Sequence, residues 1–247
     1  MTSLLICEGK TDAILYGYYL IKKFDWQYLE LKHRPRQMKN FILSDDQSFE
    51  LYQKDGRYLL IIAAGGASRF NDIWDKFKPL ISIADENYVL KKVAIIRDRD
   101  NNDDGTLISI FSNVFDSSIK ELNSWCTSEF VNDFGDMIKM EILPLVVPLD
   151  KYGALEDAIM DALSMNNSYK LIIDQSKSFV YDTKSKVNKF DTEILNEQRM
   201  IPKAVLSSFV SIVSPERTFD KVNKVLLEYK WEDNQVLSNM LRGLELL

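Results

Sequence analysis

Residues 4–12 read Leu-Leu-Ile-Cys-Glu-Gly-Lys-Thr-Asp, a short apolar run that stops at Glu8 and Gly9. From Asp12 to Phe24 the apolar residues recur at the spacing of a helix face. The stretch therefore predicts a buried strand, a tight turn and a helix, which is the opening unit of an α/β fold.

The same pattern recurs twice in the first half of the chain. Residues 58–64 (Tyr-Leu-Leu-Ile-Ile-Ala-Ala) form a continuous apolar run that ends at Gly65-Gly66, and residues 67–80 can follow as a helix. Residues 93–96 form a third run, stopped by the polar stretch 97–105. Continuous apolar runs are typical of strands buried on both faces. We therefore predict a Rossmann-like parallel sheet with helices on both faces.

The second half of the chain is largely helical in its pattern. A strand-like segment covers residues 137–147 and a helix is predicted from Tyr152 to Leu163. Beyond residue 166 the spacing predicts helices at 168–181, 202–213, 217–229 and 235–244. We expect an α/β domain over residues 1–165 and a helical C-terminal extension over 166–247 that packs on it.

The composition excludes several kinds of chemistry. The 247 residues include one histidine, His33, and two cysteines, Cys7 and Cys126. They cannot supply a structural zinc site of four Cys or His ligands, and a histidine-based triad is hard to assemble. The chain has no run long enough to span a membrane and no signal peptide pattern, so a cytoplasmic protein without a membrane partner is expected.

The charge of the chain gives a weak guide to its partners. The net charge is −6, which does not favour permanent residence on nucleic acid. The densest basic stretch is residues 32–36, Lys-His-Arg-Pro-Arg. It fits either a solvated loop or a contact with a phosphate backbone.

Acidic residues follow the predicted strands. Glu8 ends the first, with Asp12 one helical turn beyond it, and Asp98 and Asp100 end the third. These two share a face if the strand stays extended. Glu156 follows the segment 137–147. The carboxyl ends of parallel strands meet at one edge of a sheet, where so many carboxylates would repel one another without a divalent cation. Oxygen ligands favour Mg²⁺ or Mn²⁺.

Two other kinds of binding site, a P-loop for nucleotides and an EF-hand loop for calcium, fit these residues less well. Gly9-Lys10-Thr11 resembles the end of a P-loop, but Leu4 stands where that motif needs glycine. Residues 100–105 match the start of an EF-hand loop, but Phe111 stands where the bidentate glutamate should be.

The motifs together resemble the TOPRIM domain of topoisomerases, bacterial primases and related nucleases. The resemblance rests on residues 7–12, on Gly65-Gly66, on Asp98-Arg99-Asp100 and on Leu155-Glu156. More specifically, it points to the nucleases of the overcoming-lysogenization-defect type and their standalone relatives. It covers residues 3 to about 165, and beyond that it depends on a single lysine.

The resemblance implies a role for each matching residue. Glu8, Asp12 and Asp98 would hold one metal ion, and Asp100 and Glu156 a second. Glu8 would also act as general acid or base. Lys203 would stabilise the negative charge that develops on the phosphoryl oxygens, with Lys170, Lys177 and Lys221 as alternatives. The implied function is a nuclease that uses two Mg²⁺ or Mn²⁺ ions, with DNA favoured over RNA. The alternative is a non-catalytic TOPRIM module that binds metal and nucleic acid, or a partner protein, in a defence or repair system.

Overall fold

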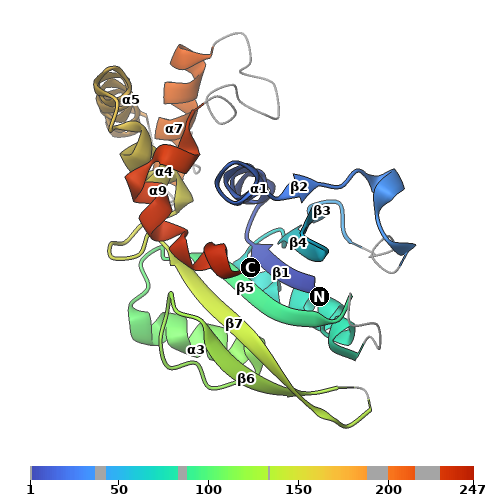
Figure 1. Cartoon of the computed structure of the whole chain (residues 1–247). Helices are drawn as coiled ribbons and strands as arrows, with labels where there is room; N and C mark the ends of the chain where they lie inside the picture. Colours follow the sequence, from blue (N-terminus) through green and yellow to red (C-terminus); the bar gives the residue numbers. More distant parts are fainter. Residues whose placement is uncertain (1, 37–42, 83–87, 133, 188–199, 215–228) are drawn as a thin grey trace.

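The computed structural model of the protein describes residues 2–36, 43–82, 88–132, 134–187, 200–214 and 229–247. These residues form an α/β fold around a seven-stranded sheet with the order β2-β3-β4-β1-β5-β7-β6 (Figure 1). The strands are β1 (Thr2–Cys7), β2 (Gln27–Tyr28), β3 (Ser48–Lys54), β4 (Arg57–Ala63), β5 (Leu90–Asp98), β6 (Cys126–Val131) and β7 (Met137–Val147).

The sheet is mixed. Its centre, β4-β1-β5-β7, is parallel as predicted. Its edges are antiparallel: β3 runs antiparallel to both β4 and β2, and β6 runs antiparallel to β7. The prediction of a wholly parallel sheet is therefore wrong at both edges. At one edge the cause is a hairpin, because Asp55 (φ 48°) and Gly56 (φ 73°) form a two-residue turn that joins β3 directly to β4.

Helices cover both faces of the sheet, and each face has its own cluster of buried side chains. One face carries α1 (Lys10–Phe24), α4 (Leu155–Leu163), α5 (Asn167–Lys186), α7 (Met200–Val213) and α9 (Gln235–Met240). The other carries α2 (Phe70–Phe77) and α3 (Asp104–Phe115). Figure 1 shows α5 and α7 side by side, extending away from the sheet.

The C-terminal region packs on the core as expected. Trp231 and Leu244 are fully buried in the same cluster as Leu143 of β7. Trp125 Nε1 donates a hydrogen bond of 2.7 Å to the carbonyl of Gly243. This contact fixes the last helical turns, residues Arg242–Leu246, against the sheet.

The predicted helices of the second half mostly match the observed ones. Those at 152–163, 168–181 and 202–213 correspond to α4, α5 and α7, and the one at 235–244 corresponds to α9 and the turn after it. The helix predicted at 217–229 lies almost wholly outside the described residues, as does Lys221. No helix within the described ranges is long and apolar enough to cross a bilayer.

Candidate active site at the carboxyl edge of the sheet

The carboxyl ends of β1 and β5 bring two predicted site residues into contact. Glu8 directly follows β1 and Asp98 is the last residue of β5, the neighbouring parallel strand. The backbone N–H of Asp98 donates a hydrogen bond to Glu8 Oε1 at 3.1 Å. The ends of these two strands therefore meet as predicted, and this hydrogen bond joins them.

The turn after β4 holds the backbone of Glu8. The amides of Gly65 and Gly66 both donate to the Glu8 carbonyl at 2.9 Å. Both glycines have positive φ, 80° and 122°, which side chains with a Cβ rarely adopt. The glycine pair that ends the second predicted strand thus fixes the position of the glutamate that ends the first.

The first turns of two helices bring further carboxylates to this edge. Asp12 lies in the first turn of α1, and its Oδ2 accepts the backbone N–H of Gly9 at 2.9 Å. Asp98 Oδ1 accepts the N–H of Leu155, the first residue of α4, at 3.0 Å. Glu156 is the next residue of that helix, and its negative charge acts on both Asp12 and Asp98.

Asp100 reaches the site by a different route from the one predicted. The chain does not stay extended after β5, because Asp100 has a left-handed backbone with φ 50°. Its amide and carbonyl pair with the carbonyl and amide of Gly153 at 2.7 and 3.0 Å. The alternation argument that put Asp98 and Asp100 on one strand face is therefore wrong. The charge of Asp100 still acts on Glu8.

Lys203 lies at the same edge, on the first turn of α7. Its Nζ is 3.8 Å from Glu156 Oε1, and its side chain is 51% exposed. Its positive charge is among the influences that lower the pKa of Asp12. Lys170 and Lys177, the alternatives, are exposed on α5.

Burial raises the pKa values of three of these acids. It is the largest cause that brings the pKa of Asp98 to about 9, and the charge of Glu8 adds to it. Burial likewise raises the pKa of Glu8 to about 7, although the hydrogen bond from Asp98 and the charge of Arg97 lower it. The pKa of Asp12 is raised to about 6. Acids of this kind need a cation nearby to ionise fully at neutral pH.

Arg99 is a residue of the site that sequence reasoning missed. Its side chain is buried, and its Nε donates to the carbonyl of Pro148 at 3.1 Å. Its guanidinium also binds the carbonyl of Leu149 and the carboxylate of Asp104. Standing between Asp98 and Asp100, Arg99 ties the acidic loop to the segment after β7. Nothing in the run Arg-Asp-Arg-Asp marks one arginine as buried.

The basic stretch at 32–36 is in part structural. Arg34 is buried, with its Nε donating to the carbonyl of Leu29 at 3.1 Å and its Nη2 3.0 Å from Glu50 Oε2. Its guanidinium also lies over the ring of Phe49. Lys32 pairs with Glu30 at 2.8 Å. Arg34 therefore fits neither alternative, because its guanidinium is used inside the fold, whereas Lys32 and His33 are exposed as in a solvated loop.

The donor set fits a hard divalent cation. It consists of carboxylate oxygens, the ligands that Mg²⁺ and Mn²⁺ prefer. Glu156 Oε2 is buried without a hydrogen-bond partner, which is costly unless something positive or hydrogen-bonding covers it. Within the described ranges, however, no group of three or more His, Cys, Asp or Glu side chains is arranged to hold an ion. Glu8, Asp12 and Asp98 each accept a backbone N–H through one oxygen, so the second oxygen of each carboxylate can still ligate an ion if the side chains move closer together.

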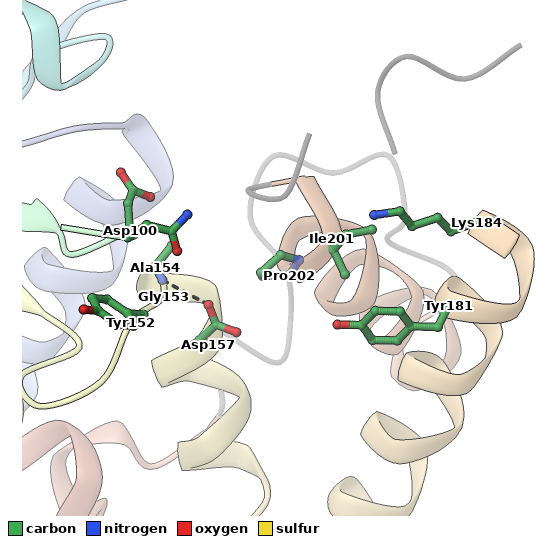
Figure 2. Close-up of a pocket in the computed structure, with 10 residues that line it drawn as sticks. Asp100, Tyr152, Gly153, Ala154, Asp157, Tyr181, Lys184, Ile201 and Pro202 are labelled. Carbon is green, nitrogen blue, oxygen red and sulfur yellow. Dashed lines mark hydrogen bonds between the residues drawn. The ribbon is translucent and has the colours of Figure 1, made fainter. Parts of the chain in front are cut away.

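A cleft of about 580 Å³ opens beside the carboxylates. One wall comes from Asp100 and residues 152–157, and the other from α5 and the start of α7 (Figure 2). Pro202, the neighbour of Lys203, belongs to the start of α7 and lies in Figure 2 between Asp157 and Tyr181. The volume is in the range of small-molecule sites.

Comparison with known proteins bears on the fold. The chain matches no family model and no curated protein. Among solved structures it is similar to a hypothetical protein from Pyrococcus horikoshii, with 17% identity and a TM-score of 0.53, over 98% of this chain and 99% of that one. The likeness shows a shared fold. At this identity it carries no statement about activity.

Proposed function

We propose that the protein is a metal-dependent phosphodiester hydrolase of the TOPRIM type that acts on nucleic acid, with DNA favoured over RNA. The observation that carries the proposal is the hydrogen bond from the Asp98 backbone to Glu8 at the carboxyl edge of the parallel strands. Asp12 lies close enough to raise the pKa of both acids, and Glu156 raises that of Asp98. Carboxylates gathered in this way are typical of sites that bind divalent cations and phosphate esters.

Each residue has a proposed role. Glu8, Asp12 and Asp98 would hold one Mg²⁺ or Mn²⁺ ion, and Asp100 and Glu156 a second. Such ions, when bound, activate water and stabilise the leaving oxygen of a phosphodiester. Glu8 has a pKa of about 7 and can accept or donate a proton near neutral pH. The single histidine of the chain, His33, is not part of the site. Lys203 supplies positive charge beside Glu156.

The experiment is cleavage of labelled single-stranded and duplex DNA and RNA by the purified protein, with Mg²⁺, with Mn²⁺ and with a chelator. Asp98→Asn is the matched control, because its amide oxygen can still accept the Leu155 N–H. The proposal expects cleavage only with metal and none by the variant. Cleavage that survives the chelator or the variant would refute the assignment.

A second candidate is the non-catalytic TOPRIM module, which binds metal and nucleic acid, or a partner protein, without hydrolysis. The observation that favours its partner-protein form is the net charge of −6, which does not favour permanent residence on nucleic acid. Metal that raises the melting temperature of the wild type without cleavage of any of these substrates would support this candidate.

A further inference from the structure

The cleft beside the carboxylates has aromatic side chains on both walls. Tyr152 precedes α4 and is 63% exposed, and Tyr181 lies on α5 and is 57% exposed. Figure 2 shows the two rings on opposite sides of the cleft, with the hydroxyl of Tyr181 directed toward its interior. Exposed aromatic rings of this kind are the surfaces on which unpaired bases stack.

One wall of the cleft also presents positive charge. Lys184 lies one helical turn beyond Tyr181 on α5, and both line the cleft. Lys170 and Lys177 precede Lys184 at seven-residue intervals, so the three lie along one side of the helix. One acid, Asp174, lies near this row. Basic rows next to aromatic rings are how proteins follow the backbone of a single strand.

The opposite wall is acidic and belongs to the site already described. Asp100 and Asp157 line it, and Asp157 Oδ2 is held at 3.0 Å by the backbone N–H of Ala154. A phosphate that approaches Asp100 directly would be repelled, whereas one guided by Lys184 would enter from the basic side. The two walls therefore define a direction of entry, from α5 toward the carboxylates.

We infer that this cleft is a nucleotide subsite in which an unpaired base stacks on Tyr181, with the adjoining phosphate near Lys184. The inference rests on the proposed function for its ligand class and adds the form of the substrate, a single strand or an unpaired end. A volume of about 580 Å³ is sufficient for a ligand of small-molecule size, such as one nucleotide.

The test measures binding apart from cleavage. Asp98→Asn serves as the background, and fluorescence anisotropy follows a labelled 12-nucleotide single strand and a hairpin duplex with Mg²⁺ present. Tyr181→Ala should weaken single-strand binding at least fivefold, as expected for the loss of one stacking contact. Tyr181→Phe should keep most of the affinity, because it retains the aromatic ring. The melting temperatures of both variants show whether the fold is intact. Lys184→Ala should reduce the slope of log affinity against log salt by about 0.7.

The same helix offers matched controls. Phe179 is 64% exposed and Lys186 is exposed, and neither lines the cleft. Phe179→Ala and Lys186→Ala should leave affinity and salt slope nearly unchanged. The inference would be overturned if Tyr181→Ala and Phe179→Ala weakened single-strand binding equally. It would also be overturned if the protein bound the duplex as tightly as the single strand, or did not bind the single strand.

The failure of this inference is distinguishable from failure of the proposed function. If the wild type cleaves with metal but the cleft variants bind like their controls, the subsite is wrong and the hydrolase assignment stands. If single-strand binding depends on Tyr181 and the wild type cleaves nothing, the subsite stands and the hydrolase assignment fails.

Discussion

The backbone N–H of Asp98 binds Glu8 Oε1 at 3.1 Å, so a carboxylate at the end of one strand caps the end of its neighbour. This hydrogen bond favours the ionised form of Glu8, whereas burial favours the neutral form and prevails, raising the pKa to about 7. The same pair places Glu8 against Asp98, where its charge helps to raise the pKa of that aspartate. The two carboxyl groups therefore differ in pKa, about 7 for Glu8 and about 9 for Asp98, so Asp98 is the more protonated at neutral pH.

The raised pKa values predict how the stability of the metal-free protein depends on pH. Unfolded Asp and Glu titrate near pH 4, whereas Glu8 and Asp98 titrate near 7 and 9 in the fold. Between these limits the folded protein holds more protons than the unfolded chain. The free energy of unfolding should therefore fall as pH rises from about 4 to 9, by at most about 1.4 kcal/mol per unit for each proton.

Urea denaturation in a chelator across this range measures the effect. Asp98→Asn should remove the fall in the free energy of unfolding between about pH 7 and 9. Of Glu8, Asp12 and Asp98, only Asp98 has a pKa that high. A free energy of unfolding that stays level or rises with pH in the wild type would contradict the assigned ionisation.

Metal binding should offset the repulsion among the acids. Replacing Asp98 and Asp100 with Asn keeps the acceptor for Leu155 N–H and suits the left-handed backbone at position 100. We expect the double variant to be as stable as the wild type without metal, or more so. Mg²⁺ or Mn²⁺ at 100 times its dissociation constant should stabilise the wild type by about 2.7 kcal/mol and leave the variant unchanged. Thermal melts with and without each ion measure this. A double variant that is badly destabilised in chelator would show that the pair is structural.

The parts of the fold that could be predicted from sequence are those set by continuous burial. The apolar runs within β1, β4 and β5 are short, contain β-branched residues and are bounded by glycine or polar residues, which favours strands over helices. Glu8 and Asp98 lie where two of these runs end. Strand β3, the neighbour of the edge strand β2, is not evident from the sequence because it lies in a polar stretch and has only two buried side chains, Leu51 and Tyr52. The Asp55-Gly56 pair before β4 is a hairpin signal that could have revealed it.

What the sequence could not supply is the path of the chain between strand end and helix. The left-handed turn at Asp100 depends on pairing with Gly153, which is 53 positions later and carries no local signal. The burial of Arg99 depends on two carbonyls after β7 in the same way. Long-range backbone contacts of this kind shape the site, and residue spacing does not encode them.

Arg99 should act on the site by holding its loop. Arg99→Lys keeps the charge but cannot reach two carbonyls and a carboxylate in the geometry of a guanidinium. We expect the free energy of unfolding to fall by about 2–3 kcal/mol, as for lost hydrogen bonds of a charged group. Metal affinity, measured by calorimetry, should fall at least tenfold.

Arg34→Lys is the matched control for this variant. Arg34 is equally buried, binds one carbonyl and one carboxylate, and lies beside the antiparallel edge of the sheet. Arg34→Lys should lower the free energy of unfolding by a similar amount and leave metal affinity unchanged. If both variants reduce metal affinity alike, the effect of Arg99 is general destabilisation and its positioning role is refuted.

Lys203 should contribute to turnover more than to binding. Its ammonium lies 3.8 Å from Glu156 and is half exposed, so it can turn toward a phosphate that enters the carboxylate edge. Lys203→Met retains the aliphatic stem and removes the charge, and we expect kcat for metal-dependent cleavage to fall about 100-fold to 1000-fold, as when a single oxyanion donor is lost. KM should change little, because the charge matters most when negative charge develops in the transition state. Lys177→Met on α5 is the control, since Lys177 is one of the alternatives that the sequence offers and is exposed on a neighbouring helix. It should raise KM if it guides the strand and should leave kcat unchanged. Cleavage that survives Lys203→Met and disappears with Lys177→Met would transfer the role to the other lysine without disturbing the carboxylate site.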